Sequence, residues 1–393
     1  MSIVVDRSPA LRPHVAALDG LRGVAVLGVL LFHTGHLPGG FLGVDLFFAL
    51  SGYLITDLLL REAAATGTVS PAAFWGRRVR RLLPALVLVL VGATLAAVAV
   101  GPPDLVRTTA ADGPWVQANL VNWHLLAESA SYWDRFGRAR VFEHLWSIAV
   151  EEQFYLGWPL VVLVIARRSG RVARRVAVAA VGGSICSAIL MIVLADPADP
   201  TRVYTGTDTR AFSLLLGAAV AAVPGIPERL AGPWSAALAA GLGTAWLVVD
   251  GADDQWLFTG GLLVHSLASA ALIGACVRAP GSTVARLLAV PPLRWLGLIS
   301  YSLYLWHWPV VVLLSTERTG LEGWTWTLLV GTVAIGLAVA SKYLVEDPIR
   351  YRAGWARGRT GLLAFVVVMI GLAVLWRVVP QPPPVTIDVT HLS

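Results

Sequence analysis

Long apolar runs separated by short polar, arginine-rich connections make up most of the chain. A helix needs about 20 residues to cross the apolar core of a bilayer, and most of these runs reach or approach that length. The pattern therefore predicts an all-α fold, a polytopic transmembrane helical bundle of about 10–11 spans. The expected spans cover residues 19–35, 41–60, 82–101, 147–166, 174–195, 210–224, 234–250, 256–277, 295–314, 324–345 and 361–379.

The segment 114–126 is amphipathic, which suits either a membrane crossing or a helix in the membrane interface. If it does not cross, the basic clusters at 77–81, 167–175 and 350–359 all fall on the side of the N-terminus. The positive-inside rule assigns that side to the cytosol. We therefore expect a cytosolic N-terminus, an external loop over 102–146 and an external C-terminal tail.

Two further patterns in the sequence concern its processing and its class of membrane protein. No small-residue cleavage pattern closes the first span, which we therefore interpret as a retained anchor. Neither a fixed-period repeat nor a matching pair of interrupted helices is visible, which argues against a transporter of the inverted-repeat type. The expected topology divides the chain into four parts. They are a cytosolic N-terminal segment (1–17), a membrane domain of ten spans (18–349), a basic cytosolic loop with an additional transmembrane helix (350–379) and a short, external, proline-rich tail (380–393).

The amino-acid composition indicates which classes of binding partner to expect. Hydrophobic residues make up 56% of the chain and charged residues only 14%, whereas soluble domains carry about 25% charged residues. The formal net charge of +6 comes from clusters between apolar runs, so it reports topology and does not predict a nucleic-acid partner. Cys186 and Cys276 each lie inside an apolar run, which predicts neither a disulfide framework nor a metal site. The lipid bilayer is the first expected partner.

Four polar residues, Arg22, His33, Asp45 and Ser51, interrupt the first two spans. A bilayer tolerates them only where protein or water surrounds them, so they are the first candidates for chemistry. On a helix Arg22 and His33 share one face, roughly 16 Å apart along the axis. Asp45 should lie at the depth of His33, where a carboxylate would fix the histidine tautomer and suit it to act as a general base. The alternative is a histidine that only hydrogen-bonds neighbouring helices.

Further polar groups are expected at the same outer level. On a helix His144, Ser147 and Glu151 share one face, while Glu152 points about 100° away from Glu151. Glu151 should face the interior, where it either belongs to the site or forms a structural salt bridge, for example to Arg210. We interpret this collection as a site that opens outward. Its members from later spans are Asp208, Arg210 and His307.

Residues 77–81 read RRVRR at the cytosolic end of the third span. Arginines at this place suit the phosphates of a CoA-type donor, which they would hold through paired N–H contacts. The alternative is an ordinary basic anchor that only sets topology.

These residues fall in motifs that resemble the acyltransferase-3 family of integral-membrane O-acyltransferases. Arg22 is followed after ten residues by His33, and five further motifs come in order along nearly the whole chain. The resemblance implies acyl transfer from a cytosolic acyl-CoA to a hydroxyl, often on a sugar of the cell envelope. It places Arg78 and Arg81 at the family's paired arginines. The further motifs are GVDLFFALSGYLI (43–55), FWGRRVRRLLPAL (74–86), HLWSIAVEEQFYL (144–156), TDTRAFSLLLGA (207–218) and ISYSLYLWHWPV (299–310).

The resemblance implies that 18–349 is an acyltransferase domain. We expect no bound cofactor, because transfer from a thioester needs a base and a stabiliser of the oxyanion, with acyl-CoA (acetyl-CoA) as co-substrate. Arg22 or Arg210 would stabilise the oxyanion, and both direct transfer and an acyl-histidine stay open. The expected residues are His33, Arg22, Asp45 and Glu151 for catalysis, Arg78, Arg81 and Arg77 for the donor, and His144, Ser147, Asp208, Arg210, Tyr301 and His307 for the acceptor or for support.

The expected acceptor is a cell-envelope glycan or its lipid-linked precursor at the bacterial cytoplasmic membrane. The alternatives are a macrolide-type secondary metabolite, which some stand-alone family members acylate, and, in a different class, a proton-coupled transporter. Some relatives carry an esterase-like domain after the last span. The short tail leaves no room for one, so spans and loops should form the acceptor surface. Four tryptophans near the outer level suit either sugar stacking or an interfacial aromatic belt, namely Trp306, Trp308, Trp324 and Trp326.

Overall fold

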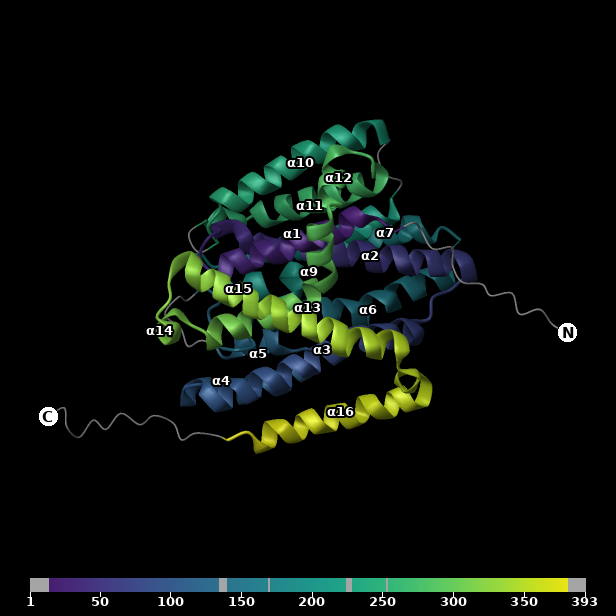
Figure 1. Cartoon of the computed structure of the whole chain (residues 1–393). Helices are drawn as coiled ribbons and strands as arrows, with labels where there is room; N and C mark the ends of the chain where they lie inside the picture. The colour runs from purple at the N-terminus through teal and green to yellow at the C-terminus, as the bar shows by residue number, and fades with distance from the viewer. Residues whose placement is uncertain (1–13, 134–139, 169, 224–227, 252–253, 381–393) are drawn as a thin grey trace, which may run out of the picture.

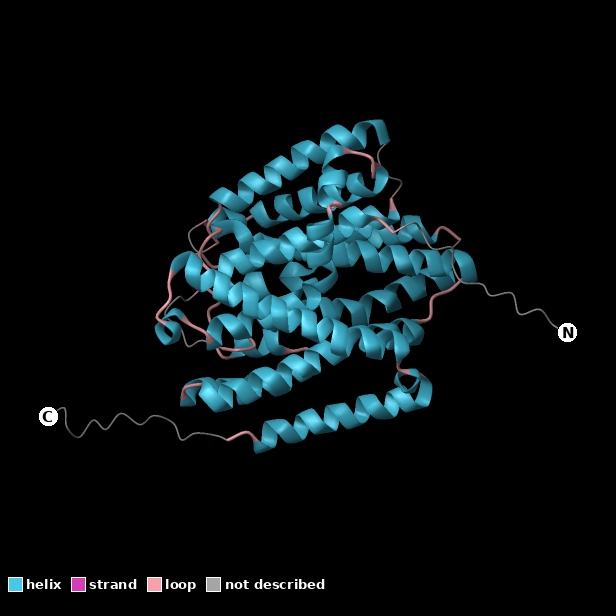
Figure 2. Cartoon of the chain, viewed as in Figure 1, coloured by secondary structure: helices cyan, strands magenta, loops and turns pink. Residues whose placement is uncertain are grey.

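The computed structural model of the chain describes residues 14–133, 140–168, 170–223, 228–251 and 254–380. Within these ranges helices are joined by loops and no strand occurs, so the predicted all-α class is confirmed (Figure 2). The long helices lie side by side in a bundle (Figure 1). They are α1 (Ala16–His33), α2 (Gly43–Thr66), α3 (Pro71–Val100), α6 (Trp146–Arg168), α7 (Val172–Leu194), α9 (Thr207–Ala222), α10 (Glu228–Val248), α11 (Gly261–Arg278), α13 (Pro291–Leu313), α15 (Gly323–Ala340) and α16 (Gly358–Val378).

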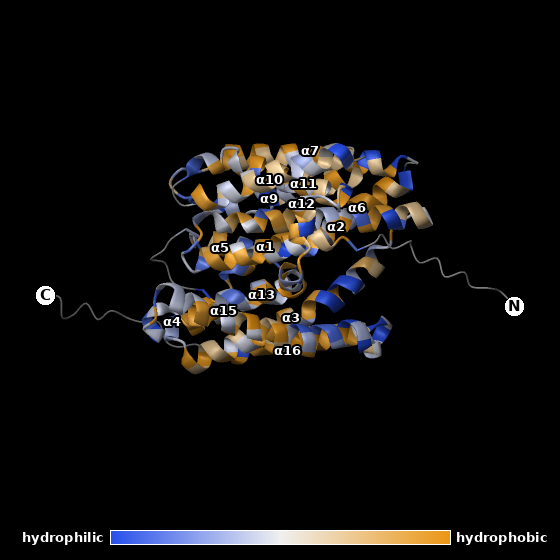
Figure 3. Cartoon of the chain, turned by 45° about the horizontal axis from the view of Figure 1, so that its top comes forward, coloured by the Kyte–Doolittle hydropathy of each residue, from blue (hydrophilic) through white to orange (hydrophobic). Residues whose placement is uncertain are grey.

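Nine helical segments in the described ranges are long and apolar enough to cross a membrane. The two other predicted spans are also helical, as α9 with 16 residues and α10 with 21. Every one of the apolar runs expected from the sequence therefore forms a helix. Hydrophobic residues cover much of the helix lengths, and hydrophilic residues gather toward the helix ends and connections (Figure 3). This distribution is that of a polytopic membrane protein.

Shorter helices connect the long ones. The segment 114–126 is not one continuous helix, because α4 ends at Gln117 and Asn119 adopts a positive φ of 56° before α5 begins. Within this segment the helical pieces 114–117 and 121–126 are each far shorter than the roughly 20 residues that a crossing requires. This agrees with the non-crossing alternative. The short helices are α4 (Pro103–Gln117), α5 (Val121–Ala127), α8 (Thr201–Thr205), α12 (Thr283–Leu288) and α14 (Thr316–Thr319), and the 3-10 turns are η1 (Pro38–Leu42), η2 (Glu143–Leu145) and η3 (Gln255–Leu257).

The C-terminal part leaves the bundle through an unusual turn. After α15 the chain forms the π-helical turns η4 (Ser341–Glu346) and η5 (Pro348–Arg352), then the short η6 (Gly354–Ala356). Pro348 has no N–H to continue an α-helical ladder, which accounts for the widened turns. The final helix α16 then lies along α4 at the edge of the molecule (Figure 1). The predicted features at 1–13 and 381–393 lie outside the described residues.

Two glycine contacts hold together the helices that carry the site. A Cβ on Gly52 of α2 would overlap the carbonyl of Leu214 in α9, and one on Gly217 of α9 would overlap the carbonyl of Ala49 in α2. Gly23 of α1 meets α13 in the same way. Small residues let membrane helices approach closely enough for their side chains to interlock. The close α1–α13 and α2–α9 pairs are therefore built on glycine.

Candidate active site

The C-terminal end of α1 brings His33 against His307 of α13. His33 Nδ1 lies 3.1 Å from His307 Nε2, and His307 Nδ1 lies 2.6 Å from the carbonyl oxygen of Tyr304. A carbonyl only accepts, so His307 Nδ1 carries the proton and His307 Nε2 accepts a hydrogen bond from His33 Nδ1. The network therefore assigns His33 Nε2 as the unprotonated nitrogen of the neutral ring. The sequence indicated both histidines but not their contact.

Asp45 does not orient His33, contrary to the expectation from depth. Its Oδ1 accepts hydrogen bonds from Arg210 Nη2 at 2.7 Å, Ser213 Oγ at 2.9 Å and Ser266 Oγ at 3.1 Å. Asp45 and Arg210 are both 0% exposed, so this ion pair joins α2, α9 and α11 inside the bundle. Two residues can share a depth and still face different neighbours, because depth does not fix the direction around the helix axis. The residue that holds His33 is His307.

His144 and Ser147, around the start of α6, contact Tyr304 and its neighbour Leu305 on α13. His144 Nε2 donates to the carbonyl of Leu305 at 3.2 Å, and its buried Nδ1 has no protein partner. The hydroxyl of Tyr304 donates to the carbonyl of His144 at 2.9 Å and lies 2.6 Å from Ser147 Oγ. His307 and His144 are 1% and 2% exposed, whereas His33 is only half-buried. His33 is therefore the accessible member of the three histidines.

A cavity of about 330 Å³ lies between α1, α2, α3, α6 and α13. Its wall includes Arg78 and Arg81 near the start of α3 and Tyr304 and Ser147 further into the bundle. The side chain of Tyr304 thus faces the cavity while its backbone carbonyl binds His307. Tyr304 therefore contacts both the cavity and His307. Other polar lining residues are Arg22, Ser51, Asp57, Arg61, Glu151, Tyr155, Ser300 and Tyr301.

Arg22 and Glu151 both face this cavity, as the sequence predicted for interior groups. Arg22 Nε donates to Ser300 Oγ at 3.2 Å. Glu151 accepts from Ser51 Oγ at 2.7 Å and from the hydroxyl of Tyr155 at 3.4 Å. The suggested salt bridge between Glu151 and Arg210 does not form, because Arg210 pairs with Asp45. Glu151 is therefore a hydrogen-bonded wall residue of the cavity.

The predicted donor arginines separate into two environments. Arg78 and Arg81 line the cavity, and the guanidinium of Arg78 lies 4.9 Å from the centre of the Tyr155 ring. Arg77, one residue earlier, lies outside the cavity wall with its side chain 47% exposed, and its Nη2 is 3.3 Å from Glu62 Oε2. Adjacent residues on a helix point about 100° apart, which explains the difference. Arg78 and Arg81 alone of these three are placed to meet a ligand in the cavity.

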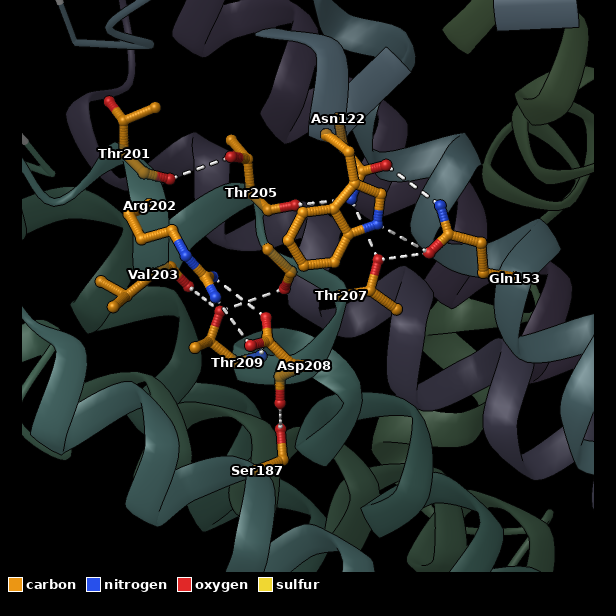
Figure 4. A network of polar contacts seen from close by, with 12 residues as sticks. Asn122, Gln153, Ser187, Thr201, Arg202, Val203, Thr205, Thr207, Asp208 and Thr209 are labelled. Atoms are coloured by element: carbon orange, nitrogen blue, oxygen red, sulfur yellow. Dashed lines mark hydrogen bonds and ion pairs between the residues drawn. The ribbon is translucent and has the colours of Figure 1, made fainter. Parts of the chain in front are cut away.

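Asp208 belongs to a network away from the histidines (Figure 4). Its carboxylate accepts two hydrogen bonds from Arg202, at 3.0 and 2.7 Å. Nearby, Gln153 of α6 donates to Asn122 of α5 at 3.0 Å and accepts from Thr207 of α9 at 2.6 Å. These bonds satisfy the polar groups and join α5, α6 and α9, which is a structural arrangement. Asp208 is therefore not placed among the residues around the cavity or His33.

Of the four tryptophans considered for sugar stacking, Trp308 contacts the site. Its ring centre lies 4.6 Å from that of His33, and its Nε1 donates to the carbonyl of Arg140 at 2.8 Å. Arg140 is in turn held by Asp112, with Nη1 2.6 Å from Oδ1. Arg140 and Asp112, which lie between α3 and α6 in the chain, thus fix the ring beside His33. Elsewhere Trp324 stacks on His36, Trp326 binds the carbonyl of Leu314 and Trp306 is buried.

Sequence reasoning missed Tyr304, Ser300 and Tyr155 as site residues. A usable signal was present in α13, because Ser300, Tyr304 and His307 are spaced four and three residues apart, as on one helix face. Tyr301, which was predicted, lies one position from this stripe and lines the cavity while donating to the carbonyl of Leu82 at 3.1 Å. Tyr155 follows Glu151 by four residues in the same way.

Comparison with known proteins agrees with the motifs. The chain is 38% identical over 354 residues to "Putative peptidoglycan O-acetyltransferase YrhL" of Bacillus subtilis, a match covering 86% of this chain and 55% of that protein. It is 36% identical to "Peptidoglycan O-acetyltransferase OatA" of Listeria monocytogenes over 86% of this chain and 56% of that protein. "O-acetyltransferase OatA" of Staphylococcus aureus is 36% identical over 86% of this chain and 57% of that protein. The chain thus spans little more than half the length of these relatives. No solved structure matches significantly.

The match at the level of the family extends across the whole cavity and histidine region. Residues 15–343, from the start of α1 into η4, match the acyltransferase-3 family model, described as an acyltransferase domain. That range contains every residue named above around the cavity and the His33–His307 pair. The chain therefore belongs to the acyltransferase-3 family of integral-membrane O-acyltransferases.

Proposed function

We propose that this chain transfers an acetyl group from cytosolic acetyl-CoA to a hydroxyl of a cell-envelope glycan, with peptidoglycan as the first candidate. The names of the relatives support the acetyl group and the glycan. The enzyme would lie in the bacterial cytoplasmic membrane as a multi-pass protein. The single observation that carries the proposal is the His33–His307–Tyr304 network beside the arginine-lined cavity.

In the proposed reaction His33 is the general base. The hydroxyl oxygen of the acceptor attacks the thioester carbonyl while its proton passes to His33 Nε2. His307 Nε2 accepts from His33 Nδ1–H, so it stabilises the imidazolium that forms. The tetrahedral intermediate then collapses to the ester and releases the CoA thiolate, which takes up a proton. Trp308 beside His33 would pack against the apolar face of the acceptor ring.

The cavity fits the donor side of this reaction. Arg78 and Arg81 at its basic end would bind phosphate groups of CoA, because a guanidinium offers several N–H donors to such oxygens. The apolar part of the wall would accommodate the pantetheine arm on its way toward Tyr304. Arg22, hydrogen-bonded to Ser300 inside the cavity, is a further cation that would attract the anionic donor there, but it lies about three helical turns from His33, too far to stabilise an oxyanion formed beside that base. Arg210 is held by Asp45 in a buried ion pair and does not face the cavity.

The test is product analysis with purified protein in liposomes. We would supply acetyl-CoA labelled in the acetyl group together with peptidoglycan fragments, a lipid-linked precursor, or neither. Label in an ester of either glycan, released by mild base, supports the proposal. Consumption of acetyl-CoA without glycan ester would reject the glycan acceptor, and no consumption at all would favour the transporter class. Label on the protein itself in the absence of acceptor would assign an acyl-enzyme route.

A further inference from the structure

A second cavity, of about 400 Å³, lies between α3 and α16 on the face of α3 that points away from the histidines. Its wall is almost entirely apolar, with Arg80 as its one charged residue. We call it the α3–α16 groove. The apolar walls are formed by Val79, Leu83, Pro84, Val87, Leu88 and Val91 of α3, by Ala364, Phe365 and Val368 of α16, and by Val345, Ile349, Trp355, Ala356 and Gly361 between them.

The α3–α16 groove is held open, because α16 is attached to the rest of the protein near both of its ends. Near its C-terminal end Trp376 is buried and its Nε1 donates to Gln117 Oε1 at 2.9 Å, while Gln117 Nε2 donates to the carbonyl of Met369 at 2.8 Å. Near its N-terminal end the turn η6 connects it to the bundle. Between these attachments α16 stands away from α3 (Figure 1). The helix is therefore held apart from α3 by its two ends.

The four arginines of the 77–81 cluster explain how one helix serves two cavities. Arg78 and Arg81 face the donor cavity, and Arg77 pairs with Glu62. Arg80 faces the groove, is half-buried and forms no ion pair with any residue in the described ranges. A half-buried guanidinium at the end of an apolar groove, without an ion pair in the described ranges, is free to bind an anion from outside the protein. The groove thus combines a hydrocarbon-lined wall with one cationic end.

The length of the groove matches one leaflet of a bilayer. Its α3 wall runs from residue 79 to residue 91, which is about 18 Å along a helix, and half of the hydrocarbon core is about 15 Å thick. Water inside it would find hydrogen-bond partners only at Arg80, and an empty groove would forfeit dispersion contacts. The acyl chain of a membrane lipid supplies those contacts, and its headgroup would then lie beside Arg80.

We propose that the α3–α16 groove is a binding site for an anionic phospholipid of the leaflet on the basic side of the protein. The acyl chain fills the groove and the phosphate accepts hydrogen bonds from Arg80. By the positive-inside rule this is the cytosolic leaflet, whose lipids carry the negative charge that suits Arg80. The proposal is independent of the acetyl-transfer function, because it concerns neither the donor cavity nor the histidines.

The test is native mass spectrometry of the full chain, delipidated in mild detergent and titrated with phosphatidylglycerol or with diacylglycerol of the same chain length. We expect a one-to-one complex with phosphatidylglycerol. Arg80→Gln should weaken that complex by about tenfold and leave the weaker diacylglycerol complex unchanged, since diacylglycerol has no phosphate and only the charge-assisted bond is lost. Ala364→Phe, which fills the groove, should abolish both complexes, and Val87→Phe repeats the filling from α3. Arg167→Gln removes an exposed arginine from the end of α6 and serves as the control.

Three outcomes would overturn the proposal. The first is wild-type protein that binds no lipid after titration. The second is equal phosphatidylglycerol affinity in Arg80→Gln and the control. The third is a lipid-free dimer that Ala364→Phe dissociates, which would assign the groove to a second copy of the chain.

Discussion

At the residue scale, the proposed base is held by a neutral imidazole where a carboxylate was expected. The carbonyl of Tyr304 fixes the proton of His307 on Nδ1, and His307 Nε2 then fixes the proton of His33 on Nδ1. The direction of both hydrogen bonds is set by the backbone carbonyl, because a carbonyl oxygen can only accept a hydrogen bond. A carboxylate in place of His307 would hold a stronger ion pair with protonated His33. The neutral ring therefore makes uptake of the proton less favourable and its return easier.

This arrangement predicts different outcomes at the two histidines. His33→Gln should lower the turnover number by about 10²- to 10⁴-fold, because an amide cannot take a proton at neutral pH. His307→Gln should retain more activity than His307→Leu, since its side-chain oxygen still accepts from His33 Nδ1. The leucine variant loses a hydrogen bond to a charged group, and we expect a loss of about 10- to 100-fold in turnover. The measurement is the initial rate at saturating acetyl-CoA.

His36→Gln is the matched control for the histidine series. His36 lies three residues after His33 and its Nε2 contacts Thr327 Oγ1 at 2.8 Å, a bond that glutamine preserves. Its turnover should stay near that of the wild type. Near-normal turnover of His33→Gln would show that His33 only joins helices and that another residue is the base.

The arginine cluster permits an equally direct comparison. Arg78→Ala and Arg81→Ala should each raise the KM for acetyl-CoA by about tenfold while changing kcat less, because they would hold phosphate and take no part in bond making. High salt should imitate this effect. Arg77→Ala should change neither constant appreciably, since an exposed ion pair contributes about 0–1 kcal/mol. If all three variants kept the KM of the wild type for acetyl-CoA, the cluster would act only in setting the topology.

Arg77 and Asp45 illustrate why the position of a residue along a span does not identify the neighbours of its side chain. Position along a span follows from counting residues, and Arg22 and Glu151, which were expected to face the interior, do line the cavity. The direction around the axis depends on which helices pack nearby, and that is a non-local property. Asp45 faces α9 and α11, so its partner is Arg210. Nothing in the local pattern distinguishes that outcome from contact with His33.

At the element scale, glycine determines which helices meet. Substituting Gly52 by Ala should destabilise the fold by about 1–3 kcal/mol, because the new methyl group overlaps the carbonyl of Leu214 and forces α2 from α9. The buried Asp45–Arg210 pair spans the same two helices and would be strained with them. The measurement is the midpoint of thermal unfolding in detergent. Gly336→Ala in α15 is the control, since its Cβ meets open space and the substitution should be neutral or slightly stabilising.

The helices themselves were predictable, because each apolar run is a local signal and the bilayer permits little besides helices. The contacts that create the site were not. His33 meets His307 because Gly23 lets α1 approach α13, although the two histidines are far apart in sequence. The π-helical turns η4 and η5 were also unpredicted, since a sequence pattern gives no distinct signal for them beyond Pro348. Long-range packing thus supplied what periodicity did not contain.

At the scale of the whole molecule, the proposed mechanism requires the donor arginines and the histidines to face opposite sides of the membrane. Along α1, Arg22 and His33 are eleven residues apart, which is about 16 Å. The cavity begins on the side of Arg61 and Arg78 and ends at Tyr304, beneath His307. The thioester end of acetyl-CoA would therefore reach across most of the bilayer inside the protein, while the phosphates of CoA remain on the basic side.

This requirement predicts which positions are accessible from outside the cell and which are not. In a background with Cys186→Ser and Cys276→Ser, single cysteines at Arg175 and Arg359 should be protected from a membrane-impermeant maleimide in intact cells. Cysteines at Glu317 and Pro380 should be labelled, because these positions follow α13 and α16 on the opposite side. All four residues are exposed, so protection reports the membrane and not burial in the protein. Permeabilised cells should label every variant. Labelling of Arg175→Cys and Arg359→Cys in intact cells would place Arg78 and Arg81 outside, where cytosolic acetyl-CoA cannot reach them, and the donor cavity would need another ligand.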